Sequence, residues 1–153
     1  MSSLESLVPP LELCRQIPEG KFADSVFVRL GETCDGDEVP GNPVWRRDTK
    51  IQRHMAACGV RMYPAPTLQE ILIDLPEFIK EDLECYLCVF DVRDQPNGDW
   101  QFGYARGYRG SLTALKSLIT RDKNPVTAAL KLWLKIEERK TNKEEEKLKN
   151  EQP

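Results

Sequence analysis

The clearest helical pattern in the chain lies between Thr67 and Pro76. Apolar residues recur there at the i, i+3, i+4 and i+7 positions of one helix face, at Leu68, Ile71, Leu72 and Leu75. Thr67 and Glu70 have the spacing of a capping box, in which each side chain bonds the other residue's backbone N–H. Pro76 lacks the N–H that another turn would need. The pattern therefore predicts an amphipathic helix over 67–75.

Three further segments are expected to be helical. A short helix over 10–16 follows a proline pair and stops before Pro18. A second helix over 48–58 begins at Asp48 or Thr49 and ends at Gly59, with Cys58 at the buried end of its apolar stripe.

The last predicted helix begins at Asn124 and Pro125, residue types that suit an N-cap and a first helical position. Its apolar face is wide and is formed by Val126, Ala129, Leu130, Trp133, Leu134 and Ile136. From residue 139 onward the chain is almost entirely charged or polar, so this part cannot join a core.

Apolar runs predict strands over 25–30, 84–93 and 100–106. Residues 94–99 are turn-forming and include Asn97-Gly98, so the last two strands should form a β-hairpin. The 84–93 run is apolar on both faces, which is typical of a strand that is central in a sheet or covered on both faces.

Residues 112–119 are ambiguous. Ser111 can cap a helix there and the leucine spacing favours one, but Thr113 and the preceding glycines also allow a third strand. The helix is preferred.

This order of elements predicts an α+β fold, a small antiparallel sheet with a β-hairpin that is packed by three to five helices. The 153 residues correspond to one ordinary domain. We expect a single domain over 1–138 and a charged tail over 139–153 that is either a solvated helix extension or disordered.

Composition narrows the location and the partners. Twenty-five acidic and 22 basic residues give a net charge of −3, which excludes a uniformly basic nucleic-acid coat but allows a local basic patch. The N-terminus lacks the basic start of a signal peptide, and no apolar run approaches the roughly 20 residues of a membrane span. Five cysteines without framework spacing indicate reduced thiols. These features predict a cytoplasmic protein with no membrane contact.

Most enzyme classes lack their signatures in this chain. His54 is the single histidine, so multi-histidine metal centres and most nucleophile–histidine pairs cannot be assembled. Phosphate-binding, dinucleotide-binding, serine-hydrolase and zinc-protease motifs are missing. We therefore predict no catalytic residues, no cofactor and no enzymatic activity.

One possible zinc constellation consists of Cys85-x-x-Cys88 with His54 and Cys58. Its residue types and number suit a structural zinc ion. On a strand, however, residues three apart point to opposite faces, so Cys85 and Cys88 would not converge. Cysteines packed in the core are the preferred interpretation, and no metal site is predicted.

Two sets of residues suggest nucleic-acid binding. The predicted hairpin carries Trp100, Phe102 and Tyr104 on one face, followed by Arg106 and Arg109, and exposed aromatic sheets beside arginines bind single strands. A second cluster lies at the start of the 48–58 helix and comprises Arg46, Arg47, Lys50 and Arg53. The competing interpretation is that the rings fill the core, as large aromatics usually do in a small sheet.

The last helix offers a possible partner surface. Its apolar face carries Trp133, which a protein partner could contact if the face were exposed. Docking of this face on the sheet is the preferred interpretation, because an apolar face this wide normally lies in a core.

Two stretches carry a resemblance. Val44-Trp45-Arg46-Arg47 running into the 63–72 segment, and Asn124-Pro125 leading to the 130–134 segment, resemble parts of small uncharacterised proteins encoded by phages and mobile elements of Bacteroidetes. The resemblance spans residues 44–136 and implies no known activity. It favours a non-catalytic accessory or protein-interaction protein, with a nucleic-acid-binding module as the alternative.

Overall fold

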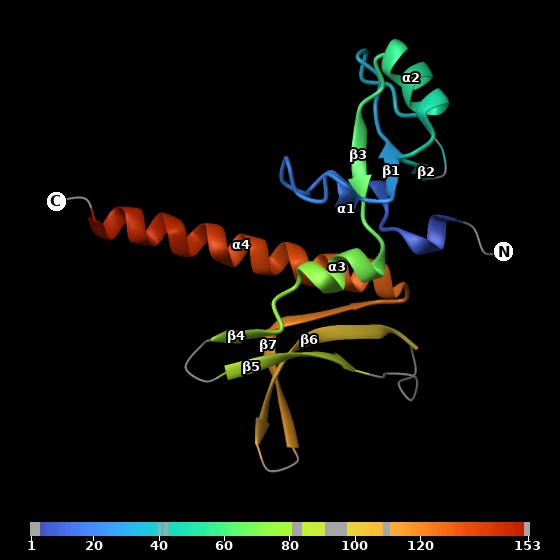
Figure 1. Ribbon diagram of the computed structural model, residues 1–153. Helices are drawn as coiled ribbons and strands as arrows, with labels where there is room; N and C mark the ends of the chain where they lie inside the picture. Colours follow the sequence, from blue (N-terminus) through green and yellow to red (C-terminus); the bar gives the residue numbers. More distant parts are fainter. Residues whose placement is uncertain are drawn as a thin grey trace.

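The protein has an α+β fold with two antiparallel sheets, as Figure 1 shows. The computed structural model describes residues 4–39, 41, 43–80, 84–90, 98–108 and 111–151. Helix α3 (Leu68–Asp74) and the first half of α4 (Pro125–Glu151) lie between the two sheets. The predicted fold class is confirmed.

The larger sheet has the strand order β4-β5-β6-β7. Its strands are β4 (Phe78–Lys80), β5 (Glu84–Phe90), β6 (Trp100–Tyr108) and β7 (Ser111–Asp122). The predicted hairpin is formed by β5 and β6, with Leu87 opposite Tyr104. β5 is an interior strand, as its two apolar faces predicted.

A glycine is required where β6 meets β7. A Cβ built on Gly103 would lie 2.8 Å from the carbonyl oxygen of Leu118 on β7. The register of the two strands shifts between Gly103 and Ala105, so the backbones approach closely beside an irregularity in the pairing.

The main core lies between the larger sheet and helices α3 and α4. Buried members include Phe102 and Tyr104 from β6, Ile71 from α3 and Trp133 from α4. Tyr104 is fully buried and its hydroxyl donates to the Pro76 carbonyl oxygen at 2.7 Å. The hairpin rings at 102 and 104 are therefore core residues. The sequence alone allowed them to be either buried or exposed.

The smaller sheet has the order β2-β1-β3. Its strands are β1 (Phe27–Leu30), β2 (Val44–Trp45) and β3 (Met62–Ala65). The 3-10 helix η1 (Leu4–Leu7) and helix α1 (Leu11–Cys14) precede it, and a second core joins Val8, Cys14, Phe27 and Ala65. Cys14 is thus a core cysteine, and burial raises the pKa of its thiol to about 11.

One buried cation supports the N-terminal segment. Arg29 of β1 is 5% exposed and donates through Nε to the Pro9 carbonyl oxygen at 2.5 Å. Its two terminal nitrogens bond the Glu5 carboxylate at 3.2 and 2.8 Å. A buried guanidinium needs such partners, so this network fastens η1 to β1.

The capped helices agree with the sequence. In α3, Thr67 and Glu70 form both bonds of the capping box. Helix α2 (Thr49–Ala57) begins with the Asp48 side chain accepting from Ile51 N, and Gly59 follows it with a φ of +70°. The expectation for Cys58 was wrong, because its side chain is exposed and α2 has no buried residue.

The preference for a helix over 112–119 was also wrong. This segment belongs to β7, which pairs with β6 along most of its length, and Leu118 and Thr120 are buried. Pairing with a neighbouring strand outweighs the helical spacing of the leucines.

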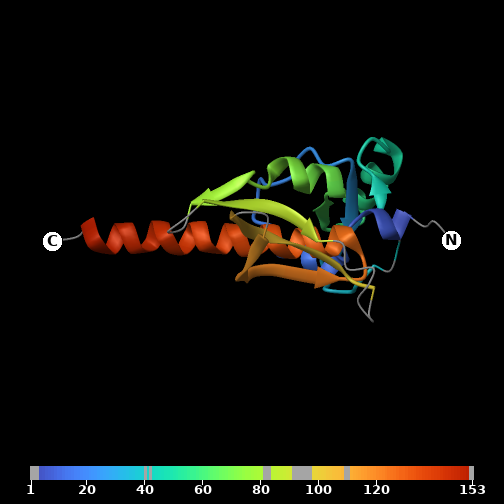
Figure 2. The same ribbon diagram turned by 90° about the horizontal axis from the view of Figure 1, so that it is seen from below.

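Helix α4 begins as predicted, with Asn124 Oδ1 accepting from Val126 N at 2.9 Å. It continues to Glu151, and every residue over 141–151 is exposed. In both views this part extends beyond the sheets toward the C-terminus (Figures 1 and 2). Among the described residues, no helix is long and apolar enough to span a membrane.

Candidate functional site

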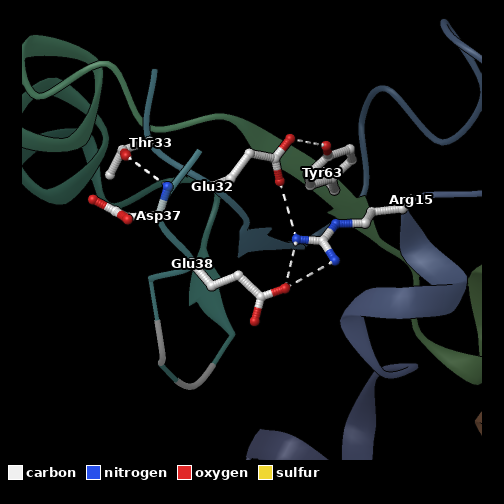
Figure 3. Close-up of polar contacts among 6 residues, drawn as sticks. All are labelled: Arg15, Glu32, Thr33, Asp37, Glu38 and Tyr63. Atoms are coloured by element: carbon white, nitrogen blue, oxygen red, sulfur yellow. Dashed lines mark hydrogen bonds and ion pairs between the residues drawn. The ribbon is translucent and has the colours of Figure 1, made fainter. Parts of the chain in front are cut away.

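A polar cluster joins the end of α1 to the smaller sheet (Figure 3). The Arg15 guanidinium donates to Glu32 Oε2 at 3.0 Å and to Glu38 Oε1 at 3.4 Å. Tyr63 of β3 donates its hydroxyl to Glu32 Oε1 at 2.5 Å. Arg15 is therefore neutralised by two carboxylates, and the cluster ties α1 to the loop after β1.

These contacts shift the pKa of Arg15, Glu32 and Tyr63. The hydrogen bond from Tyr63 is the main reason that the pKa of Glu32 is lowered. Burial and then the Glu32 carboxylate raise the pKa of Tyr63, and the bond to Glu32 raises the pKa of Arg15. The loop itself is held by a bond from Asp37 N to Thr33 Oγ1 at 3.2 Å (Figure 3).

A cavity of about 460 Å³ lies beside this cluster. Among the described residues, four cationic side chains and one carboxylate, Glu19, line it. Apolar side chains supply much of the remaining wall. The lining residues are Arg15, Ile17, Pro18, Glu19, Gly20, Lys21, Ala23, Val28, Arg46, Gln52, Arg61, Met62, Tyr63 and Pro64.

Arg46 is held in place by neutral groups. Its Nε donates to the Ser25 carbonyl oxygen at 2.6 Å, and its Nη2 bonds Ser25 Oγ at 2.9 Å. Ser25 is buried, and its hydroxyl bonds the Phe27 carbonyl oxygen at 2.8 Å. Gln52 of α2 donates to the Arg46 carbonyl oxygen. The guanidinium is thus fixed by neutral groups, and no carboxylate of the described residues pairs with it.

Two further cavity cations also lack a carboxylate partner among the described residues, Lys21 and Arg61. The Arg61 guanidinium lies over the Tyr63 ring, 5.2 Å from its centroid, and Arg15 lies 5.8 Å from the same centroid. Because Arg15 is already neutralised by Glu32 and Glu38, Arg61 is the cation on this ring that adds positive charge to the cavity wall.

The basic cluster predicted from the sequence lies between β2 of the smaller sheet and helix α2 and on α2 itself. Arg46 lines the cavity, whereas Arg47, Lys50 and Arg53 are exposed on and just before α2. None of these three forms an ion pair within the described part of the chain. Trp45 of β2, two residues before Arg47 in the chain, is 50% exposed, and its ring packs on Phe27 with centroids 4.5 Å apart. We call Trp45, Arg47, Lys50 and Arg53 the α2 basic surface.

The hairpin residues do not form the exposed aromatic face that the nucleic-acid hypothesis needed. Trp100 is 40% exposed at the start of β6, but Phe102 and Tyr104 are buried. The side chain of Arg106 and the whole of Arg109 lie outside the described residues. Among the hairpin rings whose side chains the structure describes, Trp100 alone is partly exposed.

Trp133 is not on the surface. Its side chain is 1% exposed, its Nε1 donates to Asp74 Oδ2 at 2.6 Å, and its ring lies 4.8 Å from that of Phe22. The prediction that Trp133 contacts a partner protein was therefore wrong. Trp133 is a core residue, because the apolar face of α4 packs inside the molecule.

The zinc constellation is divided between helix α2 and the larger sheet. His54 and Cys58 are on or just after α2, exposed, whereas Cys85 and Cys88 belong to β5. Among the described residues, no group of three or more His, Cys, Asp or Glu is placed to hold a metal ion.

Sequence reasoning missed three of the cavity cations, Arg15, Lys21 and Arg61. They come from three separate segments and no local motif connects them. The one available signal was the alternation of polar and apolar side chains over Arg61, Met62 and Tyr63. This alternation identifies a short strand only when its partner strand β1 is known.

Comparisons with known proteins place no constraint on this site. No protein-family model, no curated protein and no solved structure matches the chain.

Proposed function

We propose that this protein is a non-catalytic binding protein that contacts an acidic segment of a protein partner through the α2 basic surface. One observation carries the proposal: Arg47, Lys50 and Arg53 are exposed together without carboxylate partners among the described residues. Solvated cations are usually interspersed with acids, so an unpaired group beside an exposed tryptophan favours a recognition surface.

The surface combines charge with apolar area. Lys50 and Arg53 are three residues apart on α2 and so lie on neighbouring positions of one helix face. Trp45, two residues before Arg47, is half exposed, and tryptophan and arginine are enriched among residues that dominate binding energy. A partner segment with both acidic and apolar residues would complement this arrangement.

A single-stranded nucleic acid is the second candidate, and Trp45 is the observation that favours it. A base can stack on an exposed ring while cations contact phosphates. Two features weigh against it: the net charge of −3 repels a polyanion at long range, and the α2 basic surface has one exposed ring. A cytoplasmic location and a phage or mobile-element origin accompany the proposal as predictions from the sequence.

Affinity capture with charge-reversed variants tests the proposal. The tagged wild type is compared with Arg47→Glu/Lys50→Glu/Arg53→Glu, and each lysate is divided into nuclease-treated and untreated halves. The matched control, Lys143→Glu/Lys147→Glu/Lys149→Glu, reverses equal charge on the exposed end of α4.

We expect the wild type and the α4 control to retain a protein partner after nuclease treatment and the α2 variant to lose it. Loss of the partner from both variants would show that net charge, not this surface, determines binding. Loss from all samples after nuclease treatment would favour the nucleic-acid candidate.

A further inference from the structure

We propose that the cavity beside the smaller sheet binds a small phosphate monoester with an apolar body. This goes beyond the proposed partner surface, because the cavity has its own cations and takes a small molecule. Its volume of about 460 Å³ lies within the range of ligand pockets, about 300–1,000 Å³.

The charge of the lining indicates an anion. Arg15, Lys21, Arg46 and Arg61 line the cavity against the single carboxylate of Glu19. Arg15 is already neutralised by Glu32 and Glu38, but the other three cations have no carboxylate partner within the part of the chain that the structure describes. Like charges that line one cavity repel each other, so a bound anion would stabilise the arrangement.

The hydrogen-bonding capacity of Arg46 favours phosphate in particular. A guanidinium has five N–H donors, and Ser25 accepts from two of them. The others have no partner among the described residues, and the bonds to buried Ser25 fix the plane in which they lie. A rigid fork of donors matches the oxygens of a phosphate group, and prior fixation reduces the entropy lost on binding.

The rest of the wall suits the carbon part of an ester. Val28, Met62 and Pro64 come from β1 and β3, and Ile17 and Pro18 come from the segment after α1. An inorganic phosphate ion would leave this apolar surface in contact with water, whereas a monoester would cover it. An ester is therefore expected to bind more tightly than phosphate alone.

Isothermal titration calorimetry with three probes tests the proposal: phenyl phosphate, inorganic phosphate and benzyl alcohol. We expect phenyl phosphate to bind one site with a Kd at or below about 1 mM, inorganic phosphate to bind more weakly, and benzyl alcohol to give no saturable heat. Amide chemical-shift changes in NMR spectra should cluster on β1, β3 and the 15–23 segment.

Two variants and one control locate the site. Arg61→Gln and Arg46→Gln should each weaken phenyl phosphate binding by about tenfold or more, because each removes a charge-assisted hydrogen bond. Arg53→Gln removes an exposed charge outside the lining and should change the affinity less than about twofold. If Arg46→Gln does not fold, Lys21→Gln replaces it, because Lys21 forms no ion pair among the described residues.

Several results would overturn the proposal. One is the lack of saturable binding of phenyl phosphate up to about 10 mM. Equal affinity for phosphate and phenyl phosphate would refute the ester assignment. Equal losses in Arg53→Gln and Arg61→Gln would show binding to diffuse surface charge. The α2 triple variant should retain phenyl phosphate binding, so failure of this inference is distinguishable from failure of the proposed partner surface.

Discussion

Replacing Trp133 should reveal how strongly α4 is held against the sheets. The indole is 1% exposed, lies 4.8 Å from the Phe22 ring and donates to Asp74 at 2.6 Å. Trp133→Ala removes all of these contacts and leaves a cavity, so we expect it to lower the free energy of unfolding by about 3–5 kcal/mol.

A smaller substitution, Trp133→Phe, separates the cost of lost volume from the cost of the lost hydrogen bond to Asp74. Trp133→Phe keeps a six-membered ring but loses the N–H and about 40 Å³ of volume, and the empty volume costs about 1 kcal/mol at about 24 cal/mol per Å³. The bond to the exposed Asp74 carboxylate is weakened by solvent and adds about 1 kcal/mol. The expected total for Trp133→Phe is therefore about 2 kcal/mol.

Urea unfolding followed by far-UV circular dichroism measures both changes, since tryptophan fluorescence would itself be altered. Leu148→Ala is the matched control, because Leu148 is on the same helix but 63% exposed, and it should change stability by less than about 0.5 kcal/mol. A cost below about 1 kcal/mol for Trp133→Ala would refute the packing of α4 described here.

Three further predictions concern other parts of the fold. Gly103→Ala should cost about 1–3 kcal/mol in urea unfolding, because its Cβ would meet the β7 backbone at 2.8 Å; a neutral result would contradict the close approach of β6 and β7. Iodoacetamide should alkylate exposed Cys34 well before buried Cys14, whose pKa is raised to about 11, as peptide mass spectrometry can follow; equal rates would contradict the burial. Burial alone would raise the pKa of Asp122, but hydrogen bonds from the 124 amide and from Lys131 outweigh it and lower the pKa. The Asp122 carboxylate thus stabilises the folded state at neutral pH, and the stability difference between wild type and Asp122→Asn should shrink as the pH falls below about 4; a constant difference would refute this.

The sequence predicted those elements whose signals are local. The α3 capping box and the start of α4 depend on residues a few positions apart, so they were visible in the chain itself. The hairpin was visible because turn-forming residues separate two apolar runs. These features need no knowledge of distant partners.

Elements that depend on distant partners were missed. β2 has two residues and β3 includes Pro64, so neither has a recognisable strand pattern; β3 tolerates a proline because it is an edge strand. β7 reads as a helix by leucine spacing until β6 is placed beside it.

The candidate site was predictable only in part. Arg46 to Arg53 are close in sequence and were identified as a basic cluster. The cavity required Arg46, Lys21 and Arg61 to converge from three segments, and only the β2-β1-β3 pairing brings those segments together.

Photo-crosslinking tests the proposed partner surface most directly. A benzophenone amino acid is placed at Lys50 in one protein and at Lys147 in another, both exposed, and nuclease-treated extracts are irradiated. The account predicts a discrete protein adduct from position 50 and none from position 147. Equal adducts from both positions, or an adduct from position 147 alone, would contradict it.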